Sequence, residues 1–383
     1  MPFIGNQPTA IPLTSSDLTD GIVTNPKLST GSQQNFRNII INGDMSIAQR
    51  GTSSTGVTSG GYYTCDRWFI ENTTMGTFTI SQSTDVPSGQ GFASSLKYDC
   101  TTADASPASG DTIGLRQKFE GQNLQYLKFA TSSAESLTLS FWIKSNKTGT
   151  YNVALFGQDS ASTAQYFTKA YTISSADTWE KKTITYIGNT ANGFDNDNAR
   201  SLDLTFNFGT GSSNTGGTLQ TVWSNYGTSA DYYATQGVNI ADSTSNELYI
   251  TGIQLEAGDT ASEFEFLPYD LNLDRCHRYY QNYITQNDKF ITMGGYNSTN
   301  FIYMWFRFYK TMRANPSLEI NTGTNYYNVY RAGGTDSIDS LGISTNTPQG
   351  CMLYKSGESG TAGDVAFLYT NNSDVYIAFG SEL

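Results

Sequence analysis

Leu137-Thr138-Leu139-Ser140-Phe141-Trp142-Ile143-Lys144 is the stretch that decides the fold. Large apolar side chains recur at every second position, with Thr, Ser, Trp and Lys between them. Successive side chains of a β-strand point to opposite faces, so this period predicts a strand with one buried face. Residues 202–208 repeat the pattern, with leucine and phenylalanine on one face. Such strands indicate a packed β-sheet protein.

The same alternation extends over most of residues 36–268, between turns rich in Gly, Asn and Ser. Further strands are expected at 77–82, 92–99, 112–119, 150–157, 166–173, 180–187 and 246–256. About nine strands in one unit predict an all-β fold, a jelly-roll-like β-sandwich. In the last of these strands the apolar face changes at Gly252, which predicts a β-bulge.

A short helix is expected after the sandwich, at about 271–284, because apolar and aromatic residues recur there at three- and four-residue spacing with Asp270 as a possible cap. We assign 269–284 to this connecting helix and 285–383 to a smaller C-terminal distal β-domain. Strands of that domain are expected at 301–309, 326–331, 351–355, 365–369 and 375–379. Residues 301–308 are apolar on both faces, which predicts a subunit interface.

Residues 1–35 are rich in Pro, Ser, Thr, Asn and Gln and contain few large apolar groups. They could not bury enough surface on their own to offset the entropy lost on ordering. We interpret them as an extended anchor segment that docks on another chain. Its expected contacts are Phe3, Ile4, Ile11, Leu13, Leu18, Ile22, Val23 and Leu28.

The composition excludes several kinds of partner. The chain has 383 residues and a formal net charge of −12, and its 22 Lys and Arg form no run, so neither nucleic acid nor an anionic membrane surface is an expected partner. No apolar run is long enough to insert in a membrane and no secretory signal is visible, so assembly in the host cytoplasm is expected. The four cysteines lack metal-ligand spacing and are expected to be buried free thiols.

Several phrases together resemble one protein family. The opening phrases are Asn38-Ile39-Ile40-Ile41-Asn42-Gly43-Asp44-Met45, then 48–51 and Asp66-Arg67-Trp68. Later phrases lie at 115–124, 139–145, 178–182, 250–256, 264–265, 276–280 and 312–316. They are similar to bacteriophage tail fibre and tail-associated receptor-binding proteins that carry a carbohydrate-binding-module-like β-sandwich. The resemblance covers roughly residues 36–320.

The resemblance implies a protein of the virion tail, commonly a homotrimer. Its N-terminal region would attach to a tail adaptor or nozzle protein, and its distal end would mediate host recognition by binding a surface glycan.

Glycan recognition relies on exposed aromatic faces flanked by hydrogen-bonding side chains. Candidates in polar or glycine-rich surroundings are Trp142, Trp223, Tyr226, Tyr232, Tyr233, Tyr296, Tyr326, Tyr327 and Tyr330. The alternative for each is a core or subunit contact.

Catalysis is not expected. The single histidine, His277, fits packing or helix capping better than a nucleophile triad. Glu263 and Glu265 would lie on one face of a strand at a spacing that glycoside hydrolysis tolerates, but an edge with Phe inside and Glu in water explains them more simply.

A loop at 195–198 alternates Asp and Asn, so Asp195 and Asp197 could hold a structural calcium ion. Asx residues also form turns without metal, and no other cofactor is expected.

Three functions therefore remain open: a receptor-binding tail fibre, a purely structural virion adaptor or decoration protein, and a tail enzyme that degrades glycans. The polar anchor segment and the aromatic distal domain favour the first.

Overall fold

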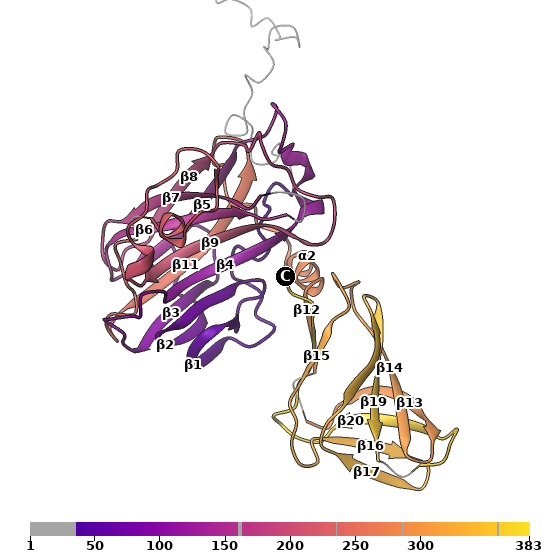
Figure 1. Ribbon diagram of the computed structural model, residues 1–383. Helices are drawn as coiled ribbons and strands as arrows, with labels where there is room; N and C mark the ends of the chain where they lie inside the picture. Colours follow the sequence, from indigo (N-terminus) through magenta and orange to yellow (C-terminus); the bar gives the residue numbers. More distant parts are fainter. Residues whose placement is uncertain (1–35, 160–162, 235, 285–286, 358–359) are drawn as a thin grey trace, which may run out of the picture.

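The chain forms two β-rich units that are joined by a short helix (Figure 1). The computed structural model describes residues 36–159, 163–234, 236–284, 287–357 and 360–383. The predicted anchor segment, residues 1–35, lies outside them. Within the described ranges the prediction of an all-β fold is confirmed.

The larger unit is one continuous path of hydrogen-bonded strands in the order β10-β7-β6-β9-β4-β2-β3-β11-β5-β8, with β1 paired to β2. The strands are β1 (Ser53–Tyr62), β2 (Phe69–Ser83), β3 (Ser95–Thr102), β4 (Thr112–Glu120), β5 (Leu137–Ser145), β6 (Gly149–Gly157), β7 (Gln165–Ile173), β8 (Glu180–Tyr186), β9 (Arg200–Thr210), β10 (Ser224–Asn225) and β11 (Glu247–Ala257). Each strand predicted between 77 and 256 overlaps one of these. Only β1 and β10 were not predicted.

Strand β2 divides the path into two layers by bending between them. Residues 69–72 pair with β4, whereas residues 77–83 pair with β3. Between these parts, Thr74 and Gly76 have φ angles of 64° and 70°, a region that an extended strand does not use. Strands β7, β6, β9 and β4 therefore form one layer, and β3, β11, β5 and β8 form the other.

Aromatic side chains fill the space between the layers. The rings of Phe141 on β5 and Phe206 on β9 lie 4.9 Å apart, and those of Tyr98 on β3 and Phe208 on β9 lie 5.2 Å apart. All four are fully buried. Edge-on packing of large rings between two sheets makes this unit a β-sandwich, as predicted.

The predicted bulge in β11 is confirmed. Gly252 has a φ of 62°, and the pairing of β11 with β5 shifts register between Thr251 and Gln254. A Cβ atom on Gly252 would lie 2.6 Å from the ring of Phe92. Glycine is required here both by its backbone angle and by the ring beside it.

Helix α2 (Tyr269–His277) is shorter than the predicted helix at 271–284. Pro268 is its N-cap residue, and Asp270 lies in the first turn without capping it. The residues that follow form strand β12 (Tyr280–Ile284), which pairs with β21 (Ile377–Gly380). This correction has a long-range cause, because the spacing of Tyr280 and Tyr283 fits a helix locally while a partner strand about a hundred residues away holds them extended.

The two units meet beside α2, where Figure 1 places the C-terminal end of the chain. Arg67 is fully buried there, stacks on Tyr279 with its guanidinium carbon 3.5 Å from the ring centroid, and pairs with Glu382. Arg278 binds Glu120 through two hydrogen bonds of 2.7 and 2.6 Å. The first pair connects the sandwich to the end of the second unit, and the second connects it to the segment that follows α2.

The smaller unit contains a three-stranded sheet, β12-β21-β15, and a seven-stranded sheet, β17-β16-β20-β13-β14-β19-β18. Its further strands are β13 (Phe290–Ser298), β14 (Phe301–Arg307), β15 (Ser317–Ile320), β16 (Tyr327–Arg331), β17 (Gly334–Ile338), β18 (Gly342–Thr347), β19 (Gly350–Ser356) and β20 (Val365–Thr370). All five strands predicted after residue 300 are confirmed. Strands β12, β13, β15, β17 and β18 were not predicted.

One face of the seven-stranded sheet carries exposed apolar side chains. We call it the distal face and define it by Phe290, Met293, Trp305, Tyr330, Val365 and Phe367, each at least 39% exposed. Tyr330 and Met293 both lie directly opposite Phe367 on neighbouring strands. The opposite face of β14 is buried in the core. The strand is thus apolar on both faces, and its contact with another subunit stays a prediction.

All four cysteines are buried and free, as expected. No helix in the described part of the chain is long and apolar enough to cross a membrane.

Candidate functional site

A cavity of about 400 Å³ opens on the outer face of the layer formed by β6, β9 and β4. We call it the tyrosine pocket. It is lined by Glu71, Arg116, Phe156, Gln158, Ala164, Arg200, Asp203, Tyr226, Tyr232 and Tyr233. Alternation places its charged residues here, because their neighbours along each strand point into the sandwich core.

Two carboxylates and two guanidinium groups form the floor of the pocket. Arg116 Nη1 lies 2.8 Å from Glu71 Oε1 and 4.0 Å from Asp203 Oδ2. Arg200 binds Asp203 with a two-pronged contact, in which Nε donates at 2.8 Å. Strands β2, β4 and β9 bring these groups together, since β4 pairs with both of the others.

Burial raises the pKa of Glu71 and of Asp203 above their ordinary values. Arg116 opposes that shift at Glu71, and the hydrogen bond from Arg200 opposes it at Asp203. Each carboxyl group is therefore held in a low-dielectric site by a neighbouring cation.

Aromatic rings form the wall of the pocket. The ring of Phe156 lies 5.4 Å from that of Tyr226 and 6.0 Å from that of Tyr232, nearly perpendicular to both. Tyr233 packs against Tyr232 at 5.0 Å. Tyr232 is only 8% exposed, whereas Tyr226 is 45% exposed. Tyr232 thus supports the wall, and Tyr226 presents its ring to solvent.

This arrangement suits a small polar ligand that offers both hydroxyl groups and an apolar ring face. Carboxylate oxygens accept hydrogen bonds from hydroxyls, guanidinium groups donate to them, and an exposed tyrosine ring covers C–H surface. Three of the candidate tyrosines named from the sequence, at positions 226, 232 and 233, are brought together here.

The charged residues of this pocket were not identified from the sequence. Asp203 alternates with the buried leucines of its strand, but nothing local shows that Glu71 and Arg116 lie beside it. Charged residues on the polar faces of several predicted strands were the available signal. Only the order of the strands in the sheet shows which of these charged residues lie next to one another.

The candidate tryptophans lie elsewhere. Trp142 is half-buried on the outer face of the other layer, opposite Thr251 and Lys181. Trp223 packs on Phe129 at 5.7 Å, and its Nε1 donates to the carbonyl oxygen of Ile187 at 2.8 Å.

The four distal tyrosines do not form one cluster. Tyr296 and Tyr327 are buried in the core of the smaller unit, so their rings cannot stack on a ligand in this structure. Tyr326 is partly buried against that core. Tyr330 is 39% exposed on the distal face, where its ring packs at 5.0 Å on that of Tyr369.

None of the residues considered for catalysis lines the tyrosine pocket. His277 is half-buried in the last turn of α2, with its ring 5.7 Å from that of Tyr309. Glu265 is buried and accepts hydrogen bonds from the backbone N–H groups of Phe36 and Asn38. Glu263 is exposed but Glu265 is not, so the expected edge with both glutamates in water is wrong. Glu265 instead fixes the backbone of residues 36–38 at the beginning of the sandwich.

At the loop considered for calcium, the carboxylate of Asp197 accepts the backbone N–H of Ala199 at 2.9 Å, which is an Asx turn. The backbone N–H of Asp195 donates to Asp159 at 2.7 Å. Among the residues that the structure describes, no group of three or more His, Cys, Asp or Glu could hold a metal ion. A calcium ion at Asp195 and Asp197 stays a prediction.

No family model matches this chain, and no curated protein is similar to it in sequence.

Three of the solved structures similar to this chain are a bacteriophage tailspike domain, a putative sugar-binding protein and a tandem carbohydrate-binding module. The enzymatically active domain of tailspike protein 4 from bacteriophage CBA120 has a TM-score of 0.31 and 14% identity, over 59% of this chain and 22% of that one. This chain thus spans about a fifth of that tailspike domain. A putative sugar-binding protein from Bacteroides thetaiotaomicron has a TM-score of 0.32 and 14% identity, over 57% of this chain and 99% of that one. A tandem carbohydrate-binding module of Paenibacillus barcinonensis Xyn10C has a TM-score of 0.25 and 10% identity, over 88% of this chain and 99% of that one.

Proposed function

We propose that this protein binds glycans and that the tyrosine pocket holds a sugar ring. The observation that supports this most strongly is the combination of an exposed Tyr226 ring with paired carboxylate and guanidinium groups in one cavity of about 400 Å³. Pockets of this size accommodate small organic ligands, and this mixture of groups matches the two sides of a sugar.

The finer proposal is that the chain is a tail fibre of a bacteriophage that recognises the host surface. The sequence phrases between 38 and 316 support it through their resemblance to tail fibre proteins. In this proposal residues 1–35 attach to a tail adaptor or nozzle protein, and three copies associate through the exposed apolar distal face. The protein then acts in the virion tail without catalysing a reaction.

Glycan binding is tested with an array of bacterial surface saccharides, followed by calorimetry on the best ligand. Replacing Tyr226 by alanine should raise the Kd about tenfold, because the ligand loses its stacking partner. The matched control is Tyr269→Ala, which removes a tyrosine that is 63% exposed and lies outside the pocket. That variant should bind like the unaltered protein.

Equal loss of affinity in both variants, or no loss in either, would remove the tyrosine pocket from the proposal. An array without any bound saccharide would leave the structural adaptor as the better reading. Release of reducing ends from a bound polysaccharide would contradict the absence of catalysis, and Glu71 and Asp203 would then be the first residues to replace.

The role in host recognition is tested by adsorption competition. Purified protein added before infection should reduce adsorption of the phage that encodes it, and light scattering on the same sample should give the mass of a trimer. A monomer that does not bind host cells would argue for a structural role. An N-terminal deletion of residues 1–30 should leave binding intact but prevent incorporation into virions.

A further inference from the structure

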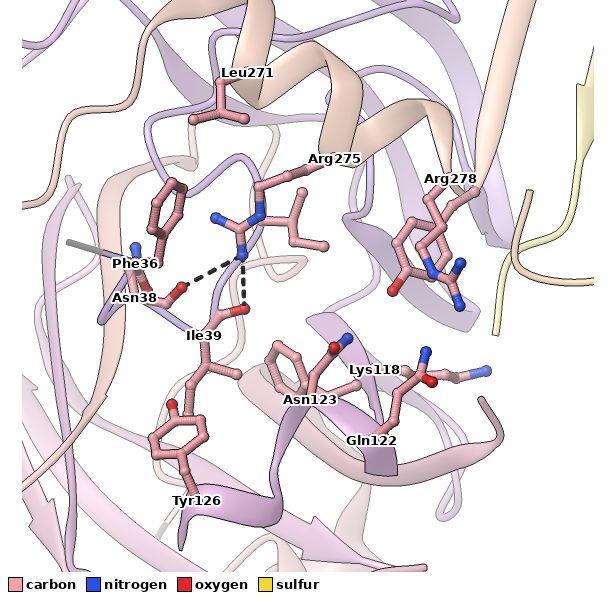
Figure 2. A pocket seen from close by; sticks show the side chains of 13 residues that line it. Phe36, Asn38, Ile39, Lys118, Gln122, Asn123, Tyr126, Leu271, Arg275 and Arg278 are labelled. Carbon is pink, nitrogen blue, oxygen red and sulfur yellow. Dashed lines mark hydrogen bonds between the residues drawn. The ribbon is translucent and has the colours of Figure 1, made fainter. Parts of the chain in front are cut away.

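A second cavity, of about 550 Å³, lies between helix α2 and the sandwich (Figure 2). We call it the α2 pocket. One wall is the backbone of residues 36–41, and the other is the short 3-10 helices η4 (Gly121–Asn123) and η5 (Gln125–Leu127). The side chain of Arg275 reaches from α2 into the space between them (Figure 2).

Three cations line the α2 pocket, and their pairing differs. Arg278 is neutralised by Glu120, and Lys118 Nζ donates to the backbone oxygen of Leu383. Arg275 forms no ion pair with any described residue, and its only hydrogen bonds are long ones, of 3.4 and 3.5 Å, to the carbonyl oxygens of Asn38 and Ile39.

Burial lowers the pKa of Arg275 below its ordinary value. Glu265 lies near enough to act on the charge of Arg275, but its oxygens accept the backbone N–H groups of Phe36 and Asn38. Arginine stays charged even so, and two long hydrogen bonds only partly replace the hydration that its guanidinium loses on burial. The chain has a net charge of −12 and so offers many carboxylates as partners, yet Arg275 forms no ion pair with any that the structure describes.

The facing wall carries groups that suit a saccharide. Asn123 is exposed and has no side-chain hydrogen bond to the described residues. The Gln122 amide nitrogen donates to Glu120 at 2.7 Å, which leaves the amide oxygen to accept from a ligand. Tyr126 is 47% exposed at the edge of the cavity. Figure 2 shows Asn123 and Tyr126 on the side opposite Arg275.

We propose that the α2 pocket binds a sugar unit that carries a carboxylate, such as a uronic acid, with Arg275 as the partner of the carboxylate. The planar fork of a guanidinium matches the two oxygens of a carboxylate. Asn123 and Gln122 would bind hydroxyl groups, and Tyr126 would cover a ring face. This site extends the proposed glycan binding, because it adds an acidic unit that the charge-balanced tyrosine pocket would not select.

The test uses the full chain and D-glucuronate, with D-glucose as the uncharged match, by ligand-observed NMR titration. Glucuronate should bind at least tenfold more tightly than glucose, and Arg275→Gln should abolish that preference. The matched control is Lys289→Gln, which removes one positive charge from an exposed position on the smaller unit and should change the Kd less than twofold.

Arg275→Lys serves if Arg275→Gln does not fold, since it keeps the charge but loses the fork, and it should weaken glucuronate binding severalfold. Asn123→Ala should weaken glucuronate and glucose to a similar degree. Equal binding of the two sugars, or an unchanged preference in Arg275→Gln, would overturn the proposal. Inorganic phosphate that competes as well as glucuronate would also overturn it, because the pocket would then be a general oxyanion site.

The outcome is separable from that of the tyrosine pocket. If the tyrosine pocket binds no saccharide, the preference for glucuronate over glucose remains a measurable property of Arg275.

Discussion

The two pockets differ in how their charged residues are balanced. In the tyrosine pocket, Glu71 and Asp203 face Arg116 and Arg200, so the four charges cancel. In the α2 pocket, Arg275 forms no ion pair with a described carboxylate, and Glu265 nearby is occupied by the backbone N–H groups of Phe36 and Asn38. A balanced pocket favours an uncharged ligand and an unbalanced one favours an ion, which is why the two sites are assigned to different sugar units.

A prediction at this scale concerns His277, the single histidine of the chain. Burial lowers the pKa of His277 below its ordinary 6.5, with Asp274 opposing the shift. Folding thus favours the neutral ring, so the unfolded chain binds more protons once the pH falls below 6.5. We expect the imidazole titration followed by NMR to have its midpoint below 6.5. The free energy of unfolding should decrease as the pH falls from 6.5 toward that midpoint.

His277→Gln isolates this effect from other groups that titrate nearby. Asp66 is one of them, since burial raises its pKa to about 6. The difference in unfolding free energy between the two proteins should change with pH only in the window of the histidine. A midpoint above 6.5 would contradict the burial of the ring that the structure shows.

Among the elements, β11 depends most visibly on one residue. Gly252→Ala would place a methyl group against Phe92 in a backbone conformation with φ of 62°. We expect a loss of about 1–3 kcal/mol in the free energy of unfolding. Chemical denaturation measures it, and Gly258→Ala is the control, because Gly258 also has a positive φ of 112° but open space around it. A smaller loss at Gly252 than at Gly258 would mean that the ring moves away easily.

Strands with one buried face could be predicted from the sequence because their apolar residues alternate. Strand β1 was missed because Val57 is its only buried residue, so no alternation is visible. Strand β12 was taken for helix because its partner, β21, lies far along the chain. The local sequence pattern is thus sufficient to predict a strand whose residues are buried alternately. It is insufficient where pairing with a distant strand determines the conformation.

The candidate site could be predicted in part for the same reason. Tyr226, Tyr232 and Tyr233 stand close together in the sequence, and their glycine- and serine-rich surroundings indicated a loop. Glu71 and Asp203 are more than a hundred residues apart and meet only through the pairing of β2, β4 and β9. The sequence around either residue therefore does not predict that the two lie close together.

For the whole molecule, the distal face makes the proposed association testable. Trp305→Lys places a charge at a position that is 57% exposed, on β14 at one margin of that apolar surface. If copies associate there, the mass from light scattering should fall to that of a monomer, since burying an unpaired ammonium group is costly. Val222→Lys alters a side chain that is 50% exposed on the sandwich and should leave the mass unchanged. An oligomer that survives Trp305→Lys would place the contact elsewhere.

Strand β21 lies between β12 and β15 in the three-stranded sheet, although it is the last of the three to be made. During synthesis the sandwich strands all leave the ribosome first and can pair with one another. The connection between the units has to wait until residues 377–380 are available, because neither β12 nor β15 has its partner earlier. A chain that lacks these residues would therefore have a folded sandwich, but its three-stranded sheet could not form. Synthesis of residues 377–380, more than folding of either larger sheet, therefore sets the moment at which the three-stranded sheet between the units can form.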